Sequence, residues 1–241
     1  MKERLATLIS GGGTTMEQII KACQSGEIPM DIAGVISSSP TAGGIEKARR
    51  LGIPEKDIIV VDPNRFKGAD KKIDQEGFGS AILKELRQRD VTVVTQNGWL
   101  PKTPPLVIEE YRETIFNQHP GPKKETRATR GIQPHAIMLY VAQHTRRNLG
   151  TEVTTHRVNE RWDDGPTVGI VPVPILDINE TPQTLQARVL PVEHRLQITL
   201  LQQLARGEIK EVSSQTQYIE PGEKHILLDA RRYARKEYPE G

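Results

Sequence analysis

Short apolar runs with strand character alternate with helical repeats through the first half of the chain, and this alternation constrains the fold more than any other feature. The runs are apolar throughout, as expected for strands that are buried on both faces. Strands of this kind pair in parallel and are joined by right-handed helical crossovers. The sequence therefore predicts an α/β fold built on a mostly parallel sheet.

The pattern changes after a polar loop at Gly121–Gly131. Two later strands, near 152–159 and 166–175, look like an antiparallel pair, and a long helix with one apolar stripe follows from Pro182 to about Gly207. The expected architecture is thus a Rossmann-like open sheet flanked by helices, with an antiparallel extension in the C-terminal half. We expect one domain over 1–212 and a C-terminal extension over 213–241 that packs on it or trails from it.

Composition narrows the function classes. The 241 residues are 36% hydrophobic and 27% charged, and no apolar run approaches the roughly 20 residues of a membrane span. The N-terminal apolar stretch is about five residues, shorter than the roughly 7–15 of a secretory signal, so we expect a cytoplasmic protein. A formal charge of +2 argues against nucleic acid as a partner, and one cysteine allows no intrachain disulfide.

A glycine-rich loop, "SGGGTT", lies between the first expected strand and the first expected helix. Three glycines let backbone N–H groups approach a ligand, and a helix N-terminus favours an anion. The spacing is not G-x-G-x-x-G, since position 16 is Met, and the lysine of a Walker A loop is missing. A phosphate monoester is therefore the expected ligand, although a tight turn with a capping box from Thr15 to Gln18 explains the threonine equally well. The expected contacts are Gly11, Gly12, Gly13, Thr14 and Thr15.

A second candidate site combines an amide, an imidazole and a carboxylate. Asn117 and His119 lie at the carboxyl end of an expected strand and share one face, where open parallel sheets bind ligands. An amide can stabilise an oxyanion, a histidine can bond the same oxygen or move a proton, and Asp163 can orient the imidazole or hold a water. A strand end before proline and a hairpin turn explain the same residues structurally, so the bare residues leave catalysis open.

The ordered set "LISGGGTT", "NQHP" and "DDGP" resembles the motifs of the folate-dependent formyltransferases, and within them the glycinamide ribonucleotide formyltransferases of purine synthesis. In that family a motif like I-S-G-x-G-S-N follows the first strand, the catalytic pair lies in N-x-H-P and the catalytic aspartate in D-x-G-P. The last match places the aspartate on Asp163 rather than Asp164. The resemblance runs from about Arg4 to Val212.

The resemblance implies transfer of a formyl group from the cosubstrate 10-formyltetrahydrofolate to a primary amine on a phosphorylated small molecule, without a metal. Asn117 and His119 would stabilise the oxyanion, and Asp163 would help to move the proton. Glu193 would contact the ribose of the acceptor. The residues that the resemblance implies for folate binding are Gln96, Trp99, Leu100, Lys102, Val158 and Asp164.

Two departures from the family pattern concern the acceptor. Thr14-Thr15 stands in place of Ser-Asn, and the loop after His119 is longer and strongly basic. The resemblance places Arg127, Arg130 and Gln133 where acceptor recognition occurs, while a solvated charge run is the alternative. The same chemistry on another amine, such as an amino sugar nucleotide, and a non-catalytic nucleotide-binding relative are therefore the competing functions. A homodimer is compatible with the sequence.

Overall fold

The computed structural model describes residues 2–147 and 150–241, which divide into two compact units. The first unit holds the chain up to Gln118, together with Arg157–Arg161 and Gln197–Ile209. The second unit holds His119–His156, Trp162–Leu196 and Lys210–Gly241. The predicted division into 1–212 and 213–241 stays a prediction.

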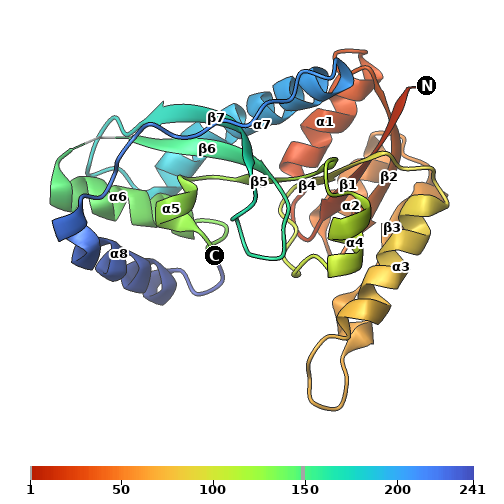
Figure 1. Cartoon of the computed structure of the whole chain (residues 1–241), viewed down its shortest axis with the longest axis horizontal. Coiled ribbons are helices and arrows are strands. Elements are labelled where there is room, and N and C mark those ends of the chain that lie inside the picture. The colour runs from red at the N-terminus through yellow and green to blue at the C-terminus, as the bar shows by residue number, and fades with distance from the viewer. Residues whose placement is uncertain (1, 148–149) are drawn as a thin grey trace. The chain divides into compact units, whose positions relative to one another are not determined.

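Five parallel strands in the order β3-β2-β1-β4-β5 form the sheet that begins in the first unit (Figure 1). In their register, Leu8 of β1 lies beside Gln96 of β4, and Gln96 lies beside Asn117 of β5. The carboxyl ends of these three strands therefore share the edge at which open α/β sheets bind ligands. The strands are β1 (Glu3–Ile9), β2 (Met30–Ser37), β3 (Ile58–Val60), β4 (Val93–Gln96) and β5 (Ile115–His119).

The helices of the first unit begin in different ways. At α3, the Asp74 carboxylate accepts the backbone N–H groups of Glu76 and Gly77, a side-chain N-cap. At α1, Gly13 is the N-cap, and no side chain caps this end within the described residues. The explanation of Thr15 as the start of a capping box is therefore wrong. These helices are α1 (Thr14–Gln24), α2 (Gly43–Arg50), α3 (Gln75–Arg87) and α4 (Pro105–Glu110), with short 3-10 helices η1 (Glu55–Asp57) and η2 (Pro63–Phe66).

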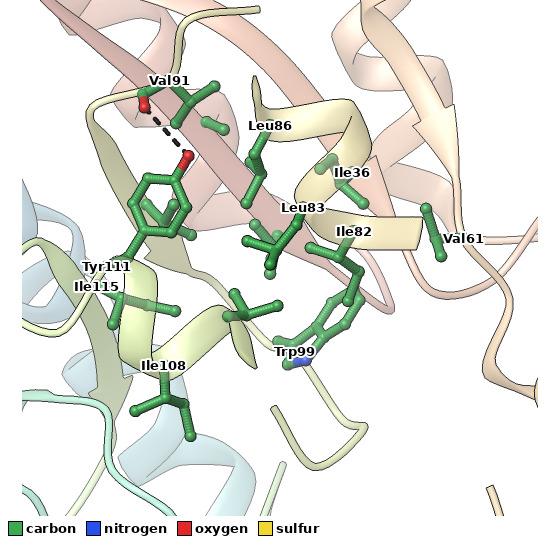
Figure 2. Packing of buried hydrophobic residues seen from close by; sticks show 14 of the residues in the cluster. Ile36, Val61, Ile82, Leu83, Leu86, Val91, Trp99, Ile108, Tyr111 and Ile115 are labelled. Atoms are coloured by element: carbon green, nitrogen blue, oxygen red, sulfur yellow. Dashed lines mark hydrogen bonds between the residues drawn. The ribbon is translucent and has the colours of Figure 1, made fainter. Parts of the chain in front are cut away.

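The core of the first unit contains a cluster of buried side chains from α3, α4 and the sheet (Figure 2). Phe78 and Ile82 lie four apart on the same face of α3, as an amphipathic helix requires. The Trp99 indole stacks on Phe78 with 6.2 Å between ring centroids. The Tyr111 hydroxyl donates to the carbonyl of Val91 at 3.1 Å, so the polar end of this buried ring is satisfied (Figure 2).

The second unit contains the antiparallel pair β6 (Gly150–Arg157) and β7 (Thr167–Pro174), and helices α5 (Lys123–Thr126), α6 (Gln133–Thr145) and α8 (Lys224–Glu237), the last preceded by η3 (Pro221–Glu223). Helix α7 (Pro182–Ala205) belongs to the second unit up to Leu196, and its remaining residues belong to the first unit. Helix α8 lies along α6 (Figure 1), and its Ala230 and Ala234 are completely buried there. Alanines four apart let two helices approach closely.

The predicted fold class is confirmed: a mostly parallel sheet with antiparallel C-terminal strands, flanked by helices. The one-turn helix α5 lies inside the stretch that was expected to be a loop, and the C-terminal extension ends in a helix. None of the helices in the described ranges is long and apolar enough to cross a membrane.

Candidate active site

His119 is the last residue of β5, and its imidazole is buried in the second unit beside Asp163. Nδ1 of His119 lies 3.6 Å from Oδ2 of Asp163, and the other carboxylate oxygen lies 3.5 Å from Nε2 of His156 on β6. None of the three residues is more than 8% exposed. One buried carboxylate is thus flanked by two buried imidazoles, an arrangement suited to holding and moving a proton.

The other ring nitrogen of His119 is held by Thr126 of α5. Nε2 lies 2.8 Å from the Thr126 hydroxyl oxygen, and that hydroxyl donates to the carbonyl of Pro122 at 2.8 Å. A hydroxyl has a single proton to donate, so Thr126 must accept its bond from an N–H at Nε2. The neutral imidazole therefore carries its proton on Nε2 and presents a bare Nδ1 toward Asp163.

Burial lowers the pKa of His119, and the Asp163 carboxylate opposes this shift while His156 and Lys123 add to it. Burial, with a smaller contribution from His119, also lowers the pKa of the nearby His135 to about 4. For Asp163, burial raises the pKa, but His119 and His156 outweigh it and bring the pKa down to about 2. At neutral pH the site therefore combines an ionised aspartate with a neutral histidine.

The backbone at Asp163 is constrained. Its φ of 48° lies in the left-handed region that non-glycine residues seldom adopt, and Ala128, at 60°, shares this conformation. The N–H of Ala128 donates to Oδ2 of Asp163 at 3.0 Å, which ties the two together. Such conformations cost about 1–3 kcal/mol each and concentrate at functional sites. The choice of Asp163 over Asp164 as the catalytic carboxylate stays a prediction.

Part of the basic stretch 123–130 docks on the aspartate turn. Arg127 forms an ion pair with Asp164, and the ammonium of Lys123 donates to the carbonyl of Gly165. Asp164, predicted to contact folate, and Arg127, predicted to contact the acceptor, therefore bind each other. Both basic side chains have a partner in the aspartate turn, although the Arg127 side chain is still 49% exposed.

The other predicted acceptor contacts face the C-terminal segment, residues 213–241. The Gln133 side chain donates to the carbonyl of Tyr238 at 2.8 Å, and that of Arg130 to the carbonyl of Glu240 at 3.3 Å. Glu193 of α7 is partly exposed, and burial of its carboxyl raises its pKa to about 8. Substrate contact by these three residues stays a prediction.

Asn117 precedes His119 by two residues on β5, so the two side chains leave the strand on the same face. Asn117 is partly exposed, whereas the preceding Ile115 and Phe116 are completely buried. Asn117 and Gln118 are thus the two partly exposed residues of β5, between the buried Phe116 and the buried His119.

In the first unit, the glycine-rich loop is a fixed turn. The N–H of Gly44 donates to the carbonyl of Gly11 at 3.0 Å. Gly13 must be glycine, because its φ is 63° and an added Cβ would lie 2.8 Å from Cα of Gly44. A Cβ at Gly11 or Gly12 would meet nothing within 4 Å, and both residues are exposed. The fold itself does not require glycine at these two positions, which fits a ligand that approaches the backbone closely.

The residues on either side of this loop connect it to its surroundings. The Ser10 hydroxyl accepts the N–H of Leu100 at 2.8 Å and lies 2.6 Å from the Ser38 hydroxyl. Thr14 is exposed and Thr15 is buried at the start of α1. Of the two predicted hydroxyl donors, Thr14 is thus the accessible one.

The residues of the first unit that were predicted to bind folate form two groups, one with buried side chains and one with exposed side chains. Gln96, Trp99 and Val158 are at least nine-tenths buried, so their side chains serve the core and any contact with folate falls to the backbone. Leu100, 47% exposed, and Lys102 lie at the surface. An exposed apolar side chain near the carboxyl edge of the sheet fits a flat ring system. Folate contact by these residues stays a prediction.

Sequence reasoning missed two members of the buried cluster, His156 and Thr126. His156 lies in the strand "GTEVTTHRV", which is buried on both faces, so strand alternation gave no signal that this histidine faces Asp163. Thr126 had no local signal, because a four-residue helix is too short to show periodicity. No group of three or more potential metal ligands occurs in the part of the chain that the structure describes.

The family model described as "Formyl transferase" matches residues 3–201. The chain belongs to the formyl transferase family. It is 29% identical over 212 residues to a chloroplastic phosphoribosylglycinamide formyltransferase of Arabidopsis thaliana, covering 87% of this chain and 68% of that one. The fold matches glycinamide ribonucleotide transformylase 1 from Symbiobacterium toebii with a TM-score of 0.73 at 26% identity, covering 88% of this chain and 95% of that one. It matches phosphoribosylglycinamide formyltransferase from Brucella melitensis with a TM-score of 0.71 at 31% identity, covering 88% and 100%.

The prediction of a folate-dependent formyltransferase that uses 10-formyltetrahydrofolate as cosubstrate is confirmed. The chemistry of formyl transfer requires a group that can accept a proton, and the buried cluster offers one. Formyl transfer to an amine creates an oxyanion and releases a proton from the attacking nitrogen. A bare imidazole nitrogen next to an ionised carboxylate can take that proton, since the carboxylate stabilises the imidazolium that forms.

Proposed function

We propose that this formyltransferase acts on glycinamide ribonucleotide as its amine acceptor. The observation that carries the proposal is the buried His119 with its bare Nδ1 facing ionised Asp163. The exposed backbone at Gly11 and Gly12 supports a phosphorylated acceptor, because backbone N–H groups at the start of a helix bind phosphate. The similar proteins from Arabidopsis thaliana and Brucella melitensis are both named for formyl transfer to this ribonucleotide.

In this proposal three residues share the chemistry. 10-Formyltetrahydrofolate supplies the formyl group and the nitrogen that leaves. The Asn117 amide donates to the oxyanion that forms when the amine attacks. Nδ1 of His119 takes the proton from the amine and returns it to the leaving nitrogen, while Asp163 stabilises the intervening imidazolium.

The test is a steady-state assay with purified protein, 10-formyltetrahydrofolate and glycinamide ribonucleotide. We expect tetrahydrofolate release that depends on the ribonucleotide. Release no greater than in the amine-free control would contradict the proposal. The variant His119→Ala, assayed in parallel, controls for a contaminating host enzyme, because it should lose the activity.

A different acceptor, such as an amino sugar nucleotide, is the second candidate. The observation in its favour is that Arg127 binds Asp164, while Arg130 and Gln133 bind the C-terminal segment, so these three predicted acceptor contacts are engaged within the chain itself. A panel of phosphorylated amines, compared by kcat/KM, discriminates the two acceptors. A higher kcat/KM for another amine than for glycinamide ribonucleotide would favour this candidate.

We also propose that the protein is located in the cytoplasm and forms a homodimer. Light scattering after size-exclusion chromatography at several protein concentrations tests the dimer through the molar mass. Subcellular fractionation of the source cells tests the location. Neither result affects the chemistry proposed for His119 and Asp163.

A further inference from the structure

Helix α8 lies beyond residues 3–201, the part of the chain that the family model matches, yet it is an integral part of the second unit. Ala230 and Ala234 are completely buried, and Leu227 and Tyr238 pack partly against the same cluster. These positions recur at helical spacing, so α8 presents one continuous apolar face to α6. The helix is therefore held in a single register along α6.

This register places Arg231 against the end of α5. Its Nε donates to the carbonyl of Glu125 at 3.0 Å, and its Nη2 donates to the carbonyl of Lys124 at 3.1 Å. The last carbonyls of a helix lack partners within that helix, and arginine side chains can satisfy them. The guanidinium thus caps α5 with two hydrogen bonds.

The bonds of Arg231 differ from the surface ion pairs of the same helix. Arg232, one residue later, is exposed and pairs with Asp229 on α8 itself. Arg231 is partly buried and, within the described residues, forms no ion pair. Its hydrogen bonds all go to the backbone of α5, more than a hundred residues earlier in the chain.

Helix α5 in turn holds the candidate catalytic histidine. Thr126 is the last residue of α5, and its hydroxyl lies 2.8 Å from Nε2 of His119. The same hydroxyl and the Thr126 N–H both bond the carbonyl of Pro122 at the start of the turn. The orientation of this hydroxyl therefore depends on the turn keeping its helical shape.

We propose that Arg231 is a positioning residue for formyl transfer, which fixes the turn of α5 and, through Thr126, the orientation and tautomer of His119. The inference rests on the function proposed above. It gives the C-terminal segment a role in catalysis that the matched family region does not include. A four-residue helix has too few internal hydrogen bonds to be stable alone, so contacts from outside the helix stabilise it, the two hydrogen bonds of Arg231 among them.

The first test compares Arg231→Ala with Arg232→Ala in the full chain. Arg231→Ala should lower kcat about tenfold to a hundredfold and leave KM for 10-formyltetrahydrofolate within about twofold, since a displaced catalytic group slows the chemical step more than binding. Arg232→Ala should match the wild type. Unchanged kcat in Arg231→Ala would overturn the proposal.

The second test does not depend on activity. Nitrogen NMR of the histidine ring reports which nitrogen carries the proton, and the wild type should show the Nε2–H form at His119. Arg231→Ala should show a mixture of tautomers, while Arg232→Ala should not. A wild-type ring signal in Arg231→Ala would refute the positioning role even if kcat fell. Because this readout needs no turnover, it also separates failure of the inference from failure of the proposed function.

A double-mutant cycle with Thr126→Val completes the design. If Arg231 acts through Thr126, adding Arg231→Ala to Thr126→Val should lower kcat little further. If the two substitutions instead lowered kcat by independent factors that multiply in the double variant, the inference would be contradicted. Should Arg231→Ala fold poorly, Arg231→Gln keeps much of the side-chain volume and a donor group, and the same kinetic and NMR criteria apply to it.

Discussion

The glycine-rich loop and the buried histidine–aspartate cluster are built in opposite ways. The loop consists of neighbouring residues whose backbone is fixed by one left-handed glycine and a contact with Gly44. The cluster joins side chains from positions 119, 126, 156 and 163, which come together only when the second unit folds. The loop therefore works through backbone shape, and the cluster through the chemical identity of its side chains.

The largest effect should follow from removing the His119 imidazole of the cluster. His119→Ala should lower kcat about a thousandfold, within the range of 10²–10⁴ that general acid–base groups contribute. Steady-state kinetics with circular dichroism as a check on folding measures it. His144→Ala, at an exposed histidine of α6, is the matched control and should keep full activity. Comparable activity in the two variants would remove the cluster from the mechanism.

Alanine at two glycines should separate the structural from the binding part of the loop. Gly13→Ala should destabilise the protein by about 1–3 kcal/mol, because alanine is strained at a φ of 63° and its Cβ would meet Gly44. Gly11→Ala should leave stability unchanged and raise KM for the phosphorylated acceptor. Urea unfolding and acceptor kinetics measure the two effects. If Gly11→Ala left KM unaltered, the loop would have no part in binding phosphate.

The surroundings of the cluster should respond to pH. Glu125 of α5 is 6% exposed, and burial raises its pKa from 4.5 to about 7. A raised carboxyl pKa means that the folded state binds the proton more tightly, so this contribution to stability is complete below pH 4.5 and is lost as pH rises through 7. Glu125→Gln should therefore be more stable than the wild type at pH 8, by on the order of 2 kcal/mol, and this advantage should shrink toward pH 5.

Urea unfolding at the two pH values checks this expectation. Glu109→Gln, at an exposed position of α4, provides the control and should show no such pH-dependent advantage. A constant difference between Glu125→Gln and the wild type across this range would mean that Glu125 does not titrate there.

The smallest effect should come from the ion pair between the basic stretch and the aspartate turn. Arg127 and Asp164 are partly exposed, and such pairs contribute about 0–1 kcal/mol. Arg127→Ala should therefore change stability by less than about 1 kcal/mol. Since its guanidinium is engaged by Asp164, KM for the acceptor should also change little. A tenfold rise in that KM would instead support the acceptor contact expected from the sequence.

Local signals allowed the strands, the glycine loop and the pair Asn117 and His119 to be predicted, because strand alternation and motif spacing are properties of neighbouring residues. The choice of Asp163 over Asp164 came only from the family motif. The partners Thr126 and His156 were missed, since their roles depend on contacts with residues distant in the sequence. The suggested capping box from Thr15 to Gln18 was wrong, because Gly13 occupies the N-cap position of α1. Arg231 could not be predicted at all, as its partners lie more than a hundred residues away.

The chain has two tryptophans, and they lie in contrasting surroundings. Trp99 is 5% exposed and stacked on Phe78 in the core of the first unit, whereas Trp162, next to Asp163, is 46% exposed. An indole in an apolar core emits at shorter wavelength than one in water, so the intrinsic fluorescence has two separable components. The component at shorter wavelength reports unfolding of the first unit, and the component at longer wavelength reports ligand binding beside the aspartate turn. The protein thus carries its own optical probes, and ligand titrations need no added label.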